Sequence, residues 1–355
     1  MITFGLVGTG WRTEFFLRIA QACPDTFTVA GIVGNTPEKT EALARRFGLK
    51  IFASVEDLVR TARPLFVVVS VTWTANPGVL TQLAALGMPV LSETPPASSI
   101  AEMDALCALV RQGAKIQVAE QYFLQPLHAA RLAFIQSGRL GRISQAQVSV
   151  AHGYHGISLI RRLLGIGFEN AKITASIFKS PIVKGPGRTG LPASEEIVES
   201  AQTFAHLDFG DRLGVFDFTS KQYFAQIRDP RLLVRGERGE IVNDTAVYLT
   251  DFTTPIRVNF IRHSAGEQGN LEGQYLKGIQ AGESWVYRNP VAPARLFDDE
   301  IAIATCLLKM AEHVRGGPDF YSLAEACQDR YLDILIDEAA KSGTAVHTTT
   351  QSWAA

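Results

Sequence analysis

The first 120 residues alternate between two patterns of hydrophobic and polar positions. One pattern consists of short continuous apolar runs, such as residues 65–71, which are typical of strands covered on both faces. In the other, apolar side chains recur every three or four positions, as at Phe15, Phe16 and Ile19, which favours amphipathic helices. The predicted strands are 3–7, 27–33, 65–71, 89–91 and 115–119, and the predicted helices are 11–23, 36–47, a short one from 54, 76–87 and 99–111. This alternation predicts a parallel sheet with helices on both faces.

Several helix starts in this region carry capping signals. Thr36 precedes Pro37, an N-cap residue followed by proline at the first helical position. Asn76 is predicted to cap the next helix in the same way. Ser99 and Glu102 have the spacing of a capping box. These signals fix where the predicted helices begin.

The pattern changes after about residue 121. The predicted elements beyond it are helices at 125–137 and 155–164, an alternating strand at 142–150, mainly strands and turns from 172 to about 286, and two amphipathic helices at 298–315 and 322–341. We therefore predict an α/β chain of two domains. Residues 1–121 would form a doubly wound parallel sheet, and residues 122–355 an α/β domain with an open, mainly antiparallel sheet.

Composition narrows the function classes. Charged residues make up 19% of the 355 and the net charge is -1, without long Lys/Arg runs, so we expect neither nucleic-acid nor membrane binding. The apolar run at 65–71 is too short to span a bilayer, and the first residues lack the features of a signal peptide. The four cysteines are scattered without metal-ligand spacing, which is typical of a reducing compartment. We predict a cytoplasmic protein.

A glycine pair follows the first predicted strand. Gly8 and Gly10 stand where the strand turns into the first helix, while Thr13 occupies the place of a third glycine. Glycines at such a turn let a pyrophosphate approach the backbone and the N-terminus of the helix. A GxG pair also occurs at purely structural turns. In this βα context it predicts a Rossmann domain that binds a dinucleotide.

The end of the second strand bears on the choice between NAD and NADP. An acidic residue there would bind the ribose 2′-OH and repel a 2′-phosphate. Asn35 stands in that segment, without a neighbouring acid, and Arg12 and Lys39 lie near it in the sequence. The same residues would also suit a capped turn with an exposed lysine. We predict NADP as the cofactor, with NAD as the alternative.

Several segments together resemble the Gfo/Idh/MocA family of oxidoreductases, which includes glucose-fructose oxidoreductase and inositol dehydrogenase. They are GLVGTGWRTEFF, LFVVVSVT, LAALGMPVLSETPPA, HGISLIRRLLG and the closing pattern from DDEIAIA to AAKSG. The resemblance spans essentially the whole chain. It implies a cofactor held near the domain junction and a carbohydrate-like substrate. It also implies a homodimer or homotetramer formed through the C-terminal sheet.

The chain departs from the family at the Glu-Lys-Pro motif, whose lysine assists the reacting hydroxyl. Glu93 is retained, but Thr94 replaces the lysine and cannot carry a charge. Thr94 can still exchange one hydrogen bond with a substrate oxygen. The resemblance implies that Glu93 lies beside the nicotinamide ribose, although it could also be a capping or salt-bridged acid.

A second departure concerns the histidine motif. His155 aligns with the family's histidine, but Ala151 stands where the family has an aspartate. The segment before His155 is also shorter than usual, so part of the substrate-side wall must be rebuilt. Arg188, in the turn-rich loop GPGRTGLP, is our candidate for that wall. His155 is the predicted acid/base, because histidine titrates near neutrality.

The remaining candidates follow from their positions. Tyr154 could hydrogen-bond to the reacting oxygen, and His152 and Tyr122 are assigned to the substrate; structural roles are open for all three. Two histidines three apart could bind a metal, but no third ligand is evident and we predict none. The other residues assigned to the cofactor are Trp11, Thr72, Trp73, Asn76 and Gln121.

These observations predict an NAD(P)-dependent oxidoreductase that moves a hydride between nicotinamide and a sugar, sugar acid or cyclitol-like polyol. The lost lysine leaves two alternatives open. One is a dinucleotide-binding sensor or regulator, and the other is an enzyme that cleaves glycosides with redox assistance.

Overall fold

The computed structural model describes residues 1–267 and 269–354. Its N-terminal half is a parallel sheet of five strands in the order β2-β1-β3-β4-β5, as the alternating pattern predicts. The strands are β1 (Ile2–Val7), β2 (Phe27–Val33), β3 (Phe66–Val69), β4 (Val90–Ser92) and β5 (Ile116–Val118). Every side chain of β3 is buried, because helices cover both faces of the sheet.

The helices of this half begin close to the predicted positions. They are α1 (Thr13–Ala22), α2 (Pro37–Phe47), α3 (Val55–Asp57) with a π-turn η1 (Leu58–Ala62), α4 (Asn76–Ala85) and α5 (Ile100–Arg111). Ser99 and Glu102 form the predicted capping box. The prediction that Asn76 caps α4 is wrong. Ala75 is the N-cap, because the Asn76 amide is turned inward and donates to Ser92 Oγ and to the carbonyl of Pro96, both at 2.9 Å.

The second half is built on a sheet of 11 strands in the order β15-β14-β13-β12-β11-β10-β6-β9-β8-β7-β16. Its strands are β6 (Ile143–Ser149), β7 (Lys172–Val183), β8 (Ile197–Asp208), β9 (Leu213–Phe218), β10 (Arg231–Gly236), β11 (Gly239–Val242), β12 (Thr245–Leu249), β13 (Pro255–Glu267), β14 (Asn270–Ala281), β15 (Ser284–Arg288) and β16 (Val346–His347). Only β6 and β9 pair in parallel, so the sheet is mainly antiparallel, as predicted.

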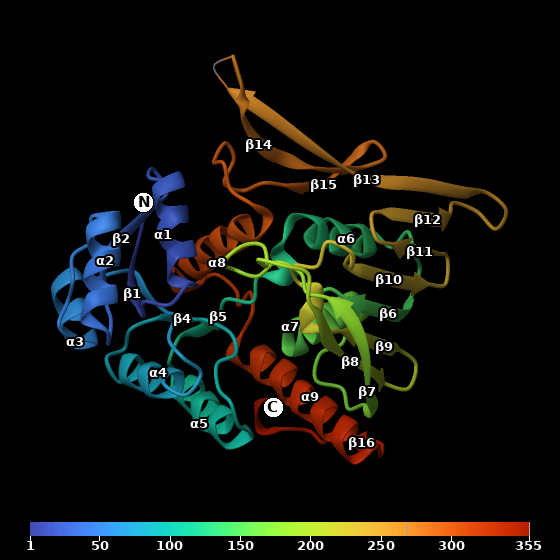
Figure 1. Cartoon of the computed structure of the whole chain (residues 1–355), viewed down its shortest axis with the longest axis horizontal. Helices are drawn as coiled ribbons and strands as arrows, with labels where there is room; N and C mark the ends of the chain where they lie inside the picture. The colour runs from blue at the N-terminus through green and yellow to red at the C-terminus, as the bar shows by residue number, and fades with distance from the viewer. Residues whose placement is uncertain (268, 355) are drawn as a thin grey trace.

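The remaining helices of the chain come after residue 121. They are η2 (Tyr122–Leu124), α6 (Pro126–Gln136), α7 (Gly153–Leu164), η3 (Ser220–Gln222), α8 (Asp298–Val314), α9 (Leu323–Ser342) and η4 (Ser352–Ala354). Figure 1 shows α8 beside α1, and α9 running beneath α7. Ion pairs of α8 with Arg12 and Arg18 on the first half hold the junction together. No helix in the described part of the chain is long and apolar enough to cross a membrane.

Candidate functional site

Two cavities meet at the carboxyl edge of the parallel sheet. The first, of about 710 Å³, runs along the glycine turn and the ends of β2 and β3, and we call it the groove. The second, of about 930 Å³, lies between the two halves, and we call it the junction cavity. Trp11, Arg12 and Trp73 line both, so the two spaces adjoin. Ligands of doubly wound sheets bind at this edge.

The two glycines of the turn differ in the space that the fold leaves for a side chain. Gly8 has φ +119°, and a Cβ there would lie 2.0 Å from the carbonyl oxygen of Ser70, so close packing of β1 and β3 already requires it. A Cβ at Gly10 would meet no protein atom within 4 Å. The fold therefore leaves an open space at Gly10, beside the first turn of α1. That space fits the phosphates of a dinucleotide.

The turn after β2, which we predicted to contact the cofactor, lines part of the groove. Asn35 and Lys39 line it, and no Asp or Glu is among its lining residues in the described chain. A Cβ at Gly34 would lie 2.3 Å from Thr40 Oγ1, so this turn also packs tightly on α2. Thr72 and Trp73 line the opposite wall. Asn76, which we assigned to the cofactor, lines neither cavity and is buried against β4.

Arg12 points into the junction cavity, and its charge is compensated there. Its Nη1 lies 2.9 Å from Asp299 Oδ2, and its Nε lies 3.7 Å from Glu93 Oε1. With its amide oriented so that both atoms find partners, Gln121 donates to the Ala119 carbonyl at 3.1 Å and accepts from Arg12 Nη2 at 2.9 Å. Arg12 thus ties α1 to the start of α8, with its charge balanced by two carboxylates.

Glu93 lies on the wall of the junction cavity. Burial raises its pKa to about 7, although the charge of Arg12 and the N–H of Thr94 both act in the opposite direction. Its Oε1 accepts no hydrogen bond from the described protein. A carboxyl group with a free oxygen at this position can accept a hydrogen bond from a ligand hydroxyl.

His155 forms a buried pair with Glu120. His155 Nδ1 lies 2.5 Å from Glu120 Oε2, and the other carboxyl oxygen accepts the N–H of Tyr122 at 3.0 Å. Burial raises the pKa of Glu120 and lowers that of His155, and the positive charge of Arg12 lowers the latter further. Both shifts favour the neutral pair, in which Glu120 keeps its carboxyl proton and the imidazole carries one ring proton.

The residues around this pair bring hydroxyl groups into the same cavity. His152 is the N-cap of α7, and its backbone N–H and its Nδ1 contact the Tyr223 hydroxyl at 2.9 and 2.5 Å. Tyr154 is buried, interacts with Thr94 and packs against Trp73 with ring centroids 6.2 Å apart. Burial raises the pKa of Tyr154, so its hydroxyl stays protonated.

Asp333 of α9 supports the start of α7. A Cβ at Gly153 would lie 2.3 Å from its Oδ1, and the N–H of Tyr154 donates to this carboxylate. Arg330, on the same helix, forms an ion pair with it. A carboxylate from α9 thus stabilises the helix turn that carries His155. Ala151, at the family's aspartate position, is fully buried and contributes no polar group.

Arg188 reaches the junction cavity from the loop between β7 and β8. Its Cζ lies 4.0 Å from the centroid of the Trp11 ring, so the loop closes one side of the cavity. Apart from Asn76, the predicted site residues therefore line the groove or the junction cavity. Sequence reasoning missed the roles of Glu120, Tyr223, Asp299 and Asp333. Only Glu120 had a usable signal, because it directly precedes Gln121 in the same motif.

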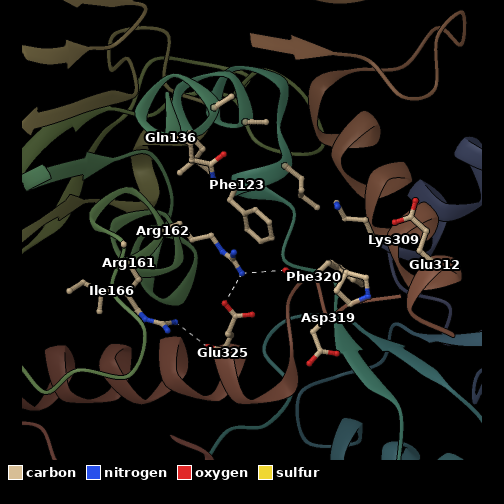
Figure 2. A pocket seen from close by; sticks show the side chains of 16 residues that line it. Phe123, Gln136, Arg161, Arg162, Ile166, Lys309, Glu312, Asp319, Phe320 and Glu325 are labelled. Atoms are coloured by element: carbon tan, nitrogen blue, oxygen red, sulfur yellow. Dashed lines mark hydrogen bonds and ion pairs between the residues drawn. The ribbon is translucent and has the colours of Figure 1, made fainter. Parts of the chain in front are cut away.

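A separate polar pocket of about 580 Å³ lies behind α7. Figure 2 shows its main polar contact, in which Arg162 binds Glu325 at 2.7 Å and the carbonyl of Phe320. Arg161 forms an ion pair with Asp329 nearby. These contacts join α7 to α9, and none of the predicted site residues lies in this pocket. In the described part of the chain, no group of three metal-ligating side chains occurs at any site.

A comparison with protein families finds a match over the N-terminal third of the chain. Residues 2–121 match the Gfo/Idh/MocA model, described as an oxidoreductase family with an NAD-binding Rossmann fold. The predicted Rossmann fold is therefore confirmed for these residues, and the matching family is one of NAD-binding oxidoreductases. No curated protein matches the chain.

Solved structures share the fold over the full length of the chain. A levoglucosan dehydrogenase in complex with NADH and levoglucosan is 16% identical, with a TM-score of 0.70, and the match covers 98% of this chain and 99% of that one. An oxidoreductase from Agrobacterium radiobacter, in complex with NAD+, L-tartaric acid and magnesium, is 16% identical, with a TM-score of 0.68 and coverage of 97% and 98%. An aldose-aldose oxidoreductase from Caulobacter crescentus is 15% identical, with a TM-score of 0.66 and coverage of 98% and 99%.

Proposed function

We propose that the whole chain is an NAD(P)-dependent oxidoreductase of the Gfo/Idh/MocA family. Its substrate would be a sugar, sugar acid or cyclitol-like polyol, oxidised or reduced at one carbon. The observation that carries the proposal is that the groove at Gly10 adjoins a cavity lined by His155, behind which Glu120 is buried and bonded to Nδ1. The names of the similar solved structures, such as levoglucosan dehydrogenase, support the substrate class.

The groove residues would hold the cofactor. Backbone N–H groups after Gly10 suit its phosphates, and Trp73 lines the passage into the junction cavity. Asn35 and Lys39, in a groove without acidic lining residues, favour NADP over NAD. Glu93 would accept a ribose hydroxyl. The nicotinamide, when bound, supplies or accepts the hydride.

His155 would transfer the proton that accompanies the hydride. With Nδ1 held by Glu120, the other ring nitrogen, Nε2, is left for the substrate oxygen. In the form of the pair in which Glu120 has lost its proton, the ring proton is on Nδ1 and Nε2 can take the proton of an alcohol. The Nδ1 proton then shifts to Glu120, so the pair ends neutral and no imidazolium remains in this buried place. The same steps in reverse serve carbonyl reduction. Glu120 is thus a positioning and relay residue for His155.

Thr94 and Tyr154 would act at the same oxygen through hydrogen bonds. Both line the junction cavity and interact with each other, so one can donate while the other accepts. They replace the charge of the family's lysine with neutral donors, which stabilise a developing alkoxide less well. We therefore propose that His155 carries most of the proton chemistry. Tyr122 and His152 would line the substrate.

We also propose that the chain forms a homodimer or homotetramer through its C-terminal sheet. Exposed apolar side chains lie on one face of β7 and β8, where the cross-strand partners Val183 and Ile197 are 42% and 61% exposed and Ile177 is 50% exposed. Such a surface is typical of an interface. Light scattering of the purified protein should give a multiple of 38.7 kDa.

The experiment is a substrate screen followed at 340 nm with NADP and with NAD, over aldoses, aldonates, uronates and cyclitols. We expect turnover with at least one substrate, and its loss in His155→Ala with cofactor binding retained. Glu338→Gln, on the exposed face of α9, is the control. Cofactor binding without any turnover would favour a dinucleotide-binding sensor or regulator. Glycoside cleavage that needs only catalytic amounts of cofactor would favour an enzyme that cleaves glycosides with redox assistance.

A further inference from the structure

The strongest feature that the proposed function does not use is the charge of Arg188. It stands in a hairpin turn formed by Gly187-Arg188-Thr189-Gly190, closed by backbone hydrogen bonds of 2.9 and 3.0 Å between the two glycines. The loop leaves β7 and returns to β8, and Figure 1 shows it reaching from the C-terminal sheet toward α8. The turn therefore presents Arg188 to the cavity from the opposite domain.

The contacts of Arg188 fix the position of its guanidinium but do not pair its positive charge. Its guanidinium stacks on Trp11 at 4.0 Å, which fixes its position through a cation–π contact. Among the described residues, Arg188 makes no ion pair. The other cations and acids on the wall of the cavity are largely matched in pairs, which are Arg12 with Asp299 and Glu93, Arg18 with Glu300, and Glu14 with Arg46. Among the described residues that line the cavity, Arg188 is thus the cation that has no ion-pair partner.

The position of Arg188 points to the substrate side. Arg188 lines the junction cavity with His152 and Tyr223, and it does not line the groove around Gly10 and Lys39. Its positive charge also contributes to lowering the pKa of His152, after burial and His155, so the field of Arg188 acts inside the cavity. A guanidinium in such a place matches the planar fork of a carboxylate.

We infer that Arg188 binds the anionic group of the substrate, and that the enzyme acts on sugar acids in preference to neutral sugars. This inference deepens the proposed function and rests on the same cavity. The carboxylate would lie at the mouth beside Trp11, and the carbon that reacts would lie inward, next to His155 and Thr94. Arg188 thus selects the substrate and sets which end of it enters first.

Direct binding tests the inference without turnover. Calorimetry on protein saturated with NADP would compare D-glucuronate with D-glucose, and D-gluconate with D-glucitol. We expect each acid to bind at least tenfold more tightly than its neutral partner. Arg188→Met should remove this preference and leave the neutral partners unchanged, and Arg188→Lys should keep part of it. Thr189→Ala, in the same turn, is the matched control.

Three results would overturn the inference. The acids could bind no better than the neutral sugars, or Arg188→Met could weaken both classes equally, which would indicate a structural role for the turn. Arg188→Met could also weaken NADP and leave the acids unaffected, which would assign the guanidinium to the cofactor phosphates. Acid binding that depends on Arg188, in a protein without any turnover at 340 nm, would support the inference while the proposed function failed.

Discussion

Replacing Glu120 by glutamine should stop catalysis and leave the fold intact. The two side chains have the same shape, so the contact of Oε1 with the Tyr122 N–H can be kept. The contact with His155 changes in kind, because an amide cannot take up or release a proton. If its nitrogen donates to Nδ1, the imidazole is fixed with its proton on Nε2, and that nitrogen can no longer accept from an alcohol.

The magnitudes follow from burial and protonation. Glu120 is fully buried, and its raised pKa means that the pair carries no net charge near neutrality. Exchanging one neutral hydrogen bond for another should change the free energy of unfolding by about 1 kcal/mol or less. Loss of general acid–base catalysis should lower kcat by about 10²–10⁴-fold, with KM nearly unchanged.

Three measurements separate these effects. Steady-state kinetics at 340 nm gives kcat and KM, urea titration gives the free energy of unfolding, and ¹⁵N NMR of the imidazole reports its tautomer. Because the two residues act as one unit, Glu120→Gln combined with His155→Ala should be no slower than His155→Ala alone. A Glu120→Gln enzyme within threefold of the wild-type kcat would refute the relay. A large loss of stability would instead indicate a structural pair.

Three further predictions concern the glycine turn, the cofactor and pH. Gly8→Ala should destabilise the protein by about 3 kcal/mol or more, because its Cβ would overlap a backbone oxygen. Gly10→Ala should melt like the wild type but weaken cofactor binding in calorimetry. Equal melting temperatures of the two variants would contradict this prediction. Lys39→Ala should raise the KM for NADP at least tenfold and leave that for NAD unchanged, and an equal effect on both cofactors would argue against the 2′-phosphate. From pH 7.5 to 8.5, above the range in which the lowered pKa values of His152 and His155 act in the opposite direction, the free energy of unfolding, measured in urea, should fall as pH rises. Buried Glu93, with a pKa of about 7, and Glu120, with a raised pKa, keep protons that the unfolded chain has already lost. Glu93→Gln should flatten this fall, and an unchanged slope in that variant would show that the shift is absent.

The predictions from local pattern agree best with the structure where neighbours in sequence decide the outcome. The buried run at 65–71 contains β3, and the capping box at Ser99 starts α5. Asn76 shows the limit of such reasoning. Its position before Pro77 suits a cap, but the tight packing of α4 on β4 draws its amide into the interior, where Ser92 and Pro96 accept its protons.

The sequence by itself determined the βα alternation, the glycine turn with its acid-free neighbourhood, and His155 as the candidate acid/base. Only the tertiary structure decided how these groups act. Glu120 and His155 are 35 positions apart, and Arg12 and Asp299 are 287 apart, yet each pair is in contact. Hydrophobic periodicity follows from local geometry and can be seen in a short window of sequence. The charge state of a buried group depends on the solvent it loses and the partners it gains, and both depend on how distant segments pack.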